Sequence, residues 1–185
     1  MSRRGTIPPR HRVFCGCEGE SERGYVAWLQ RTLDVDAPRG HLDAVLLKPG
    51  AGDPWELVKL AGKKAQENEQ RRGAYKSRWL FLDADRRDEA ADRRTAVERH
   101  AYGAGLRLVW QEPNHEGLLL RHLPGCETLR PPAATAASVL RRHWPDYAKP
   151  MSANDLAARL DANSLRRALR VEAELAVFLR DLGFT

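Results

Sequence analysis

Four short apolar segments, each followed by a longer polar or amphipathic stretch, constrain the fold of this chain more than any other feature. They cover residues 12–17, 41–48, 78–82 and 106–110. The third, RWLFL, is dominated by an unbroken apolar run, as in a central strand buried on both faces. Strands that alternate with helical patterns at this spacing favour a parallel sheet with right-handed crossovers. We therefore expect an α/β fold with a mostly parallel four-stranded sheet flanked by helices.

The remaining third of the chain is expected to be helical. A length of 185 residues suits one domain with a helical addition. We expect a flexible basic arm over residues 1–10, the α/β core over 11–123, and a C-terminal extension over 124–185 that packs on the core. Apolar residues at helical spacing predict two or three helices in this extension. They cover about 135–144, about 152–161 and 164–182, the last being long and amphipathic.

The charge balance favours anionic partners. The net charge is +6 at pH 7 and the pI is about 9.5, which suits a partner such as nucleic acid. Three cysteines without a secretory signal indicate a reducing compartment, so we expect a cytoplasmic protein. No apolar stretch approaches the roughly 20 residues that a bilayer span needs, so we expect no membrane partner. Composition leaves open whether the chain forms a homo-oligomer.

Acidic residues follow three of the predicted strands. Glu18 follows the first, Asp83 and Asp85 follow the third, and Glu116 follows the fourth. Ligands of open parallel sheets bind beyond the C-terminal ends of the strands. Carboxylates gathered there repel one another unless a cation neutralises them, and oxygen ligands suit Mg²⁺ or Mn²⁺. Glu22, one helical turn after Glu18, is a candidate ligand for a second metal ion.

Other polar and aromatic residues are open to two interpretations. Lys48, Arg86 and Arg87 flank the predicted strand ends and are candidate phosphate contacts, although solvated surface positions fit them equally well. His122 fits a packed histidine better than a catalytic one, because its spacing from Glu116 places the two on different sides of a helix. The tryptophans favour packing over base stacking. Those considered in this way are Trp28, Trp55 and Trp144.

Four segments, in sequence order, carry a resemblance to a known family. They are CEGESERGY, LFLDAD, EPNHEGLLLRH and the later YAKPMSANDLAARLDANSLRRAL, whose start includes Tyr147 and Lys149. They resemble the RloB-like family, which belongs to the wider Toprim group and has a Glu-Gly at one strand end and an Asp-x-Asp at another. The resemblance implies a Toprim-like (Rossmann-like) fold.

The resemblance also implies roles for the acidic residues. The family's Glu-Gly matches Glu18 and the glycine after it, and its Asp-x-Asp matches Asp83 and Asp85. In Toprim relatives these acids hold Mg²⁺ for phosphodiester chemistry. Glu22 and Glu116 carry over as second-metal ligands or as a general acid/base pair. RloB-like proteins are associated with prokaryotic antiviral defence, often beside an ATPase partner.

The function expected from these observations is a metal-dependent nuclease, cleaving DNA or RNA as an effector of anti-phage defence. Two other functions stay open. The first is a non-catalytic module that binds nucleic acid or a partner within a defence complex. The second is a nucleotidyl-transfer enzyme similar to a primase, because the same acids serve that chemistry.

Overall fold

The computed structural model describes residues 11–36, 40–47, 52–84 and 91–184, without the side chains of 35, 36, 91 and 92. Four strands form one sheet in the order β2-β1-β3-β4, and every neighbouring pair is parallel. The expected α/β fold with a parallel four-stranded sheet is therefore confirmed. The strands are β1 (His11–Cys17), β2 (Gly40–Leu46), β3 (Ser77–Asp83) and β4 (Arg107–Gln111).

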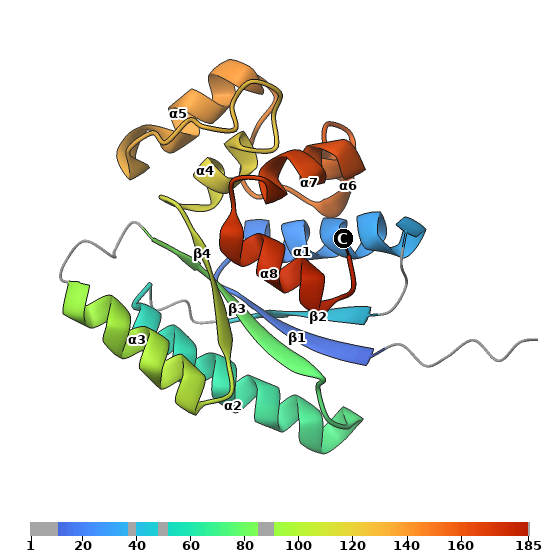
Figure 1. Ribbon diagram of the computed structural model, residues 1–185, viewed down its shortest axis with the longest axis vertical. Coiled ribbons are helices and arrows are strands. Elements are labelled where there is room, and N and C mark those ends of the chain that lie inside the picture. The colour runs from blue at the N-terminus through green and yellow to red at the C-terminus, as the bar shows by residue number, and fades with distance from the viewer. Residues whose placement is uncertain (1–10, 37–39, 48–51, 85–90, 185) are drawn as a thin grey trace, which may run out of the picture.

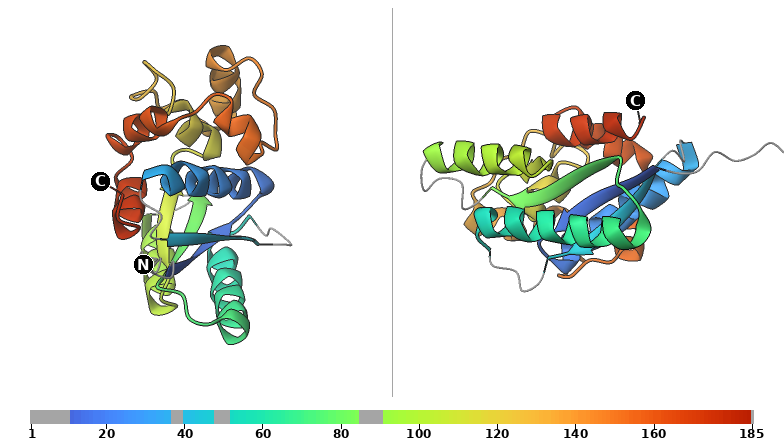
Figure 2. Two further views of the ribbon diagram at one scale, coloured as in Figure 1. Left: turned by 90° about the vertical axis from the view of Figure 1, so that its right-hand side faces the viewer. Right: turned by 90° about the horizontal axis from the view of Figure 1, so that it is seen from below.

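Helices cover both faces of the sheet. Figure 1 shows α2 and α3 on one face, and α1 with the C-terminal helices on the other, and Figure 2 shows the same layers from two further directions. The helices are α1 (Glu20–Asp36), α2 (Pro54–Arg72), α3 (Ala91–Gly103), α4 (His115–Leu120), α5 (Ala133–His143), α6 (Ala153–Ala157), α7 (Ala162–Leu169) and α8 (Ala173–Asp181). No helix within the described ranges combines the length and apolar character that a bilayer span requires.

Side chains of the strands alternate between two separate cores, because successive residues of a strand point to opposite faces. On β3, Trp79 and Phe81 enter the core shared with α1 and the C-terminal helices. Leu80 and Leu82 enter the core shared with α2 and α3. All four residues are buried, which confirms that this apolar run is a central strand covered on both faces.

The C-terminal helices pack directly on the sheet. Phe178 of α8 makes edge-to-face ring contacts with Trp79 and Phe81, with ring centroids 5.1 and 5.4 Å apart. Such aromatic pairs add about 0.5–1.5 kcal/mol to the burial of their apolar area. Residues of α8 therefore form one continuous core with the central strand.

The prediction of one long helix over 164–182 is wrong. Two helices, α7 and α8, lie there instead, and Glu172 between them has an extended conformation with φ −110° and ψ 87°. The carboxylate of Glu172 forms an ion pair with Arg121, which is fully buried. A buried guanidinium requires a partner. The chain ends one helix before Glu172 and begins another after it, although the local apolar pattern favours a single helix, and Glu172 pairs with Arg121 at this break.

Candidate active site at the carboxyl edge of the sheet

Three acidic residues predicted as site residues lie at one edge of the sheet. Asp83 is the last residue of β3, Glu18 directly follows β1, and Glu116 lies in the first turn of α4 after β4. β3 lies between β1 and β4, and all three strands run in the same direction. Their carboxyl ends therefore meet at the same edge, as expected for a ligand site of a parallel sheet.

The strand register brings Glu18 close to Asp83. Cys17 of β1 pairs with Phe81 of β3, so Glu18 and Asp83 are one and two residues beyond that pair. Neighbouring strands lie about 4.8 Å apart, which puts the two backbones within reach of a shared ligand. Asp83 continues the alternation of Phe81, so its side chain belongs to the face covered by α1 and the C-terminal helices.

A lysine from the C-terminal extension enters this group of acids. Lys149 Nζ lies 2.5 Å from Glu116 Oε1, and the hydroxyl of Tyr147 donates a hydrogen bond of 3.0 Å to the same oxygen. Burial would lower the pKa of Lys149, but the pKa is raised because Glu116, and then Asp83 and Glu22, place negative charge around it. The ammonium group thus contacts one carboxylate and is affected by the negative charge of two more.

Two glycines allow the backbone to approach closely at this site. A side chain at Gly24 of α1 would collide with the backbone carbonyl oxygen of Met151, two residues after Lys149. A side chain at Gly117 of α4 would collide with the Glu112 carbonyl. Gly24 therefore positions the loop that carries Lys149, and Gly117 positions the turn that carries Glu116.

Glu22 lies beside a buried histidine. Its Oε1 is 4.0 Å from Nδ1 of His115. A Cβ atom built at Gly19 would lie only 2.8 Å from its Oε2, so the carboxylate folds back over the turn after β1. Burial lowers the pKa of His115, although Glu22 and Glu116 act against this effect. The Gln111 amide donates a 3.1 Å hydrogen bond to Nδ1, which places the proton of the neutral ring on Nε2.

The donor atoms at this edge suit a hard cation, since Glu18, Glu22, Asp83 and Glu116 all offer carboxylate oxygens. In their present arrangement, however, no three metal-binding side chains in the part of the chain that the structure describes could hold an ion together. The ammonium group of Lys149 lies among these carboxylates. The chemistry of the donors therefore fits Mg²⁺ or Mn²⁺, and binding requires their carboxylates to move closer together.

Four other residues predicted for this site lie outside the described residues. They are the second acid of the Asp-x-Asp motif and the three candidate phosphate contacts: Asp85, Lys48, Arg86 and Arg87. Their roles stay predictions.

His122 is packed in the core. It is fully buried, its Nδ1 donates to the Leu118 carbonyl at 3.0 Å, and its Nε2 lies 3.1 Å from the hydroxyl of Tyr25. Burial lowers its pKa to about 4. The ring is therefore neutral near pH 7 and joins α4 to α1.

Sequence reasoning missed the contact of Lys149 and Tyr147 with Glu116. More than thirty residues separate them from Glu116 along the chain, and no spacing rule relates such positions. The only signal in the sequence was that both lie in a segment that resembles the RloB-like family. A comparison of the chain with family models, with curated proteins and with solved structures finds no match in any of the three.

Proposed function

We propose that this protein is a Mg²⁺- or Mn²⁺-dependent nuclease with a Toprim-like active site at the carboxyl edge of the sheet. The observation that supports this most is the surplus of negative charge there. Asp83, Glu22 and Glu116 all act on the single ammonium of Lys149, and Glu18 follows the neighbouring strand. An added divalent cation would relieve the repulsion between these carboxylates.

Glu18 and Asp83 would hold the metal ion, with Asp85 and Glu22 as further ligands. When bound, the ion supplies Lewis-acid stabilisation of a phosphoryl group and activates water. Asp83 and Glu18 come from neighbouring strands of a rigid sheet, and such placement suits the precise orientation that phosphoryl transfer needs.

Glu116 would act as the general base. Burial would raise its pKa, but its contacts with Lys149, with its own backbone amide and with Tyr147 hold the pKa below its ordinary value, so it is ionised near pH 7. In hydrolysis the oxygen of water forms a bond to phosphorus, the bond to the leaving oxygen breaks, and Glu116 takes a proton from the water. The leaving oxygen is protonated by solvent.

Lys149 would position Glu116 and bind the phosphate. Its side chain is 51% exposed, whereas Glu116 is only 3% exposed. The ammonium group can therefore contact Glu116 and an incoming anion from the solvent side, and a charge-assisted hydrogen bond to phosphate is stronger than a neutral one.

A role in anti-phage defence, with an ATPase as partner, is part of the proposal. It is supported by the resemblance to RloB-like proteins and by the net charge of +6, which suits nucleic acid.

The test is a cleavage assay with plasmid, single-stranded DNA and tRNA in the presence of Mg²⁺ or Mn²⁺, with and without an ATPase encoded nearby. Cleavage should require the metal and should be lost in Asp83→Asn and Glu18→Gln. Glu67→Gln is the matched control, because Glu67 lies on α2 with a partly exposed side chain and forms a weak ion pair with Lys64, at 3.9 Å. Activity that survives both site substitutions would refute the assigned residues.

One observation favours a second function, a nucleic-acid-binding module without catalysis. The ammonium of Lys149 already neutralises part of the acidic group, and among the described side chains no ready metal site exists. This alternative predicts nucleic-acid binding with a steep salt dependence but no metal-dependent product. Calorimetric titration with Mn²⁺ separates the two functions, because only the nuclease requires the metal.

A further inference from the structure

α2 and α3 cover the face of the sheet opposite α1 and the C-terminal helices (Figure 1), and a groove lies between these two helices. Its wall is formed by two stacked rings, Trp55 of α2 and His100 of α3, with centroids 4.2 Å apart and planes inclined by 13°. The groove has a volume of about 500 Å³. It is lined by Trp55, Ala96, Arg99, His100, Gly103 and Ala104.

Small residues keep this groove open. Gly62 on α2 faces Ala104, since a Cβ atom at Gly62 would lie 3.8 Å from the Ala104 side chain. A Cβ atom at Gly103 would meet no atom within 4 Å. One face of each ring is covered by the other ring, so a flat group in the groove would lie against the parts of Trp55 and His100 that remain exposed.

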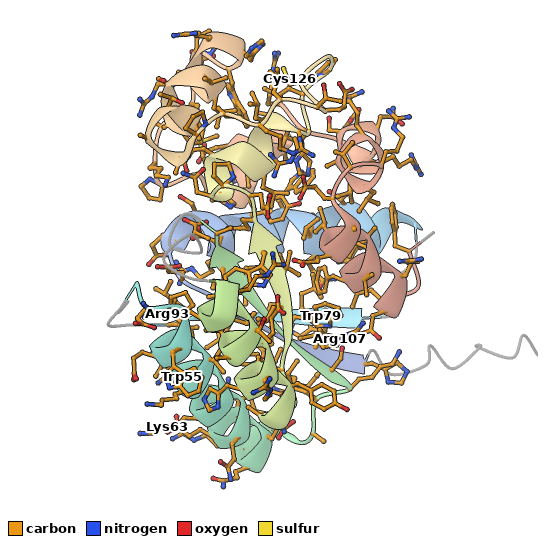
Figure 3. The ribbon with its side chains drawn as sticks, turned by 60° about the vertical axis from the view of Figure 1, so that its left-hand side comes forward. Trp55, Lys63, Trp79, Arg93, Arg107 and Cys126 are labelled. Atoms are coloured by element: carbon orange, nitrogen blue, oxygen red, sulfur yellow. The ribbon has the colours of Figure 1, made fainter. Side chains whose placement is uncertain are left out.

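Positive charge lies along the rim. Lys63 of α2 and Arg99 of α3 are both exposed, and neither forms an ion pair with any other described residue. Figure 3 shows Trp55 and Lys63 on α2. Arg93 of α3 lies near the start of α2, where it forms an ion pair with Asp53. Trp55 and Lys63 are eight residues apart, or about 12 Å along the helix. Arg99 thus lies in the groove with Trp55, and Lys63 lies further along α2.

A second exposed ring lies beside this rim. Tyr102 is 85% exposed and is three residues after Arg99 on α3. Residues three apart on a helix are neighbours on its surface, so Arg99 lies between the groove and a second aromatic surface.

We propose that this α2–α3 groove binds single-stranded nucleic acid. Bases stack on aromatic rings regardless of sequence, and lysine and arginine bind the phosphates between them. The alternation of rings with unpaired cations fits a chain that alternates flat bases with negative phosphates. A duplex fits less well, because its bases are stacked on one another and cannot lie against Trp55 or His100.

This inference names the class of substrate for the proposed nuclease. It rests on the proposed function in one respect, namely that the bound strand is then cleaved. α2 and α3 both begin on the carboxyl side of the sheet, after β2 and β3. A strand held in the groove can therefore continue towards the edge where Asp83 lies. Binding itself needs no metal, so it is measured separately from cleavage.

Tryptophan fluorescence provides a direct readout. The chain has five tryptophans, and the four others, Trp28, Trp79, Trp110 and Trp144, are at most 5% exposed. Quenching by a bound base will therefore report mainly on Trp55. The probe is a thymidine oligomer of about twenty nucleotides, long enough for one site of this kind. It is added in EDTA at several salt concentrations, and the same sequence as a duplex is tested in parallel.

The expected result is that the single strand quenches the fluorescence and binds at least about tenfold more tightly than the duplex. Trp55→Leu should weaken binding about tenfold. The double variant Lys63→Glu/Arg99→Glu should weaken it by a similar factor and reduce the slope of log K against log salt by about 1.4, or 0.7 for each phosphate contact. Arg142→Glu/Arg170→Glu is the charge-matched control on exposed positions of the opposite side, and it should keep both the quenching and most of the affinity.

The proposal is overturned if the two double variants lose affinity equally, because the effect is then one of net charge alone. It is also overturned if the duplex binds as tightly as the single strand, or if a poly-glutamate peptide quenches as strongly as the oligomer. Circular dichroism checks the folding of each variant. If Trp55→Leu fails to fold, the Lys63/Arg99 variant decides, because both side chains are exposed. A result in which Asp83→Asn abolishes cleavage while these variants bind normally refutes the groove and leaves the proposed active site intact.

Discussion

Two ion pairs connect α4 to the C-terminal extension, and they differ in how their charges balance. Glu116 at the start of α4 pairs with Lys149, and Arg121 just after α4 pairs with Glu172. Arg121 is fully buried, and its partner also contacts Arg130 at 3.7 Å. Lys149, in contrast, is half exposed.

The difference separates a structural ion pair from a candidate site. Around Glu172, two guanidinium groups, the buried one of Arg121 and the half-exposed one of Arg130, contact one carboxylate, so no negative charge is left over. Lys149, in contrast, contacts the single carboxylate of Glu116 at a solvent-accessible edge, and the negative charges of Asp83 and Glu22 also raise its pKa. A surplus of negative charge in reach of solvent can accept a further cation, whereas a buried, neutralised pair cannot. Charge balance, rather than the presence of an ion pair, thus distinguishes the two regions.

The largest expected effect concerns Asp83. Asp83→Asn removes a predicted metal ligand while it relieves repulsion among the acids. The rate of metal-dependent cleavage should fall by a factor of about a thousand or more, as expected when metal stabilisation of the transition state is lost. The midpoint of thermal unfolding should stay the same or rise. If the variant lost stability together with activity, Asp83 would stabilise the fold, as Arg121 does, and would not be shown to bind metal.

Arg121→Met tests the other ion pair. Removal of Arg121 leaves the carboxylate of Glu172 with only the half-exposed Arg130 as a partner, at 3.7 Å. The cost in the free energy of unfolding should therefore be below the roughly 3–5 kcal/mol that is typical of a fully broken buried pair. Urea unfolding at neutral pH measures this cost. The double variant Arg121→Met/Glu172→Leu should recover most of the stability, and any folded fraction should bind Mn²⁺ normally. A loss of Mn²⁺ affinity in the folded double variant would show that the two regions are not independent.

Gly24→Ala tests the loop that brings Lys149 to the acids. The new methyl group would collide with the Met151 carbonyl, so the loop must move, at a cost of about 1–3 kcal/mol in the free energy of unfolding. Gly62→Ala is the matched control in the interior of α2, where the nearest contact is 3.8 Å. There alanine should stabilise the helix by about 0.5–1 kcal/mol. Equal effects of the two substitutions would contradict the close approach at Gly24.

Lys149→Gln should increase the surplus of negative charge at the edge. Mn²⁺ should then bind about tenfold more tightly, because the metal no longer competes with the ammonium group. Cleavage should nevertheless fall about tenfold, since the phosphate loses a charged contact. Calorimetry and the cleavage assay measure the two quantities separately. Weaker Mn²⁺ binding in this variant would mean that Lys149 assembles the acids instead of balancing them.

The smallest expected effect is the pH dependence of stability through Glu116. Burial would raise the pKa of this carboxyl, but Lys149 and Tyr147 outweigh burial and hold the pKa below its ordinary value. A group with a lowered pKa stabilises the fold above its unfolded pKa and loses that contribution as the pH falls through its folded pKa. The difference in unfolding free energy between wild type and Glu116→Gln should therefore shrink below about pH 4.3. A difference that stays constant in acid would exclude the ion pair as its source.

The sheet and its acidic edge could be predicted from sequence because they depend on local patterns. Strand burial appears directly as apolar runs, and parallel strands bring their carboxyl ends to one edge, so the positions of Glu18 and Asp83 follow from the order of elements. In the sequence, the segment around Lys149 stands out only for its expected resemblance to the RloB-like family, which stays a prediction, and its contact with Glu116 was not predicted.

Contacts between distant segments could not be predicted in this way. The break between α7 and α8 depends on the pairing of Glu172 with Arg121, fifty-one positions earlier in the chain. The need for glycine at position 24 depends on a loop that begins more than a hundred residues later. The prediction that Trp55 is a packing residue is confirmed, because it packs against the core under α2 and α3, but its stacking partner, His100, could not be predicted. In each case the partner is set by the tertiary fold, and local periodicity carries no information about it.

Calorimetric titration of the wild-type protein and Asp83→Asn with Mn²⁺ tests most directly whether the acidic edge of the sheet is a metal site. The wild type should bind the ion, and Asp83→Asn should lose at least about tenfold in affinity while its unfolding midpoint is unchanged. Absence of binding to the wild type, or equal binding to both proteins, would contradict the assignment of this edge as the active site.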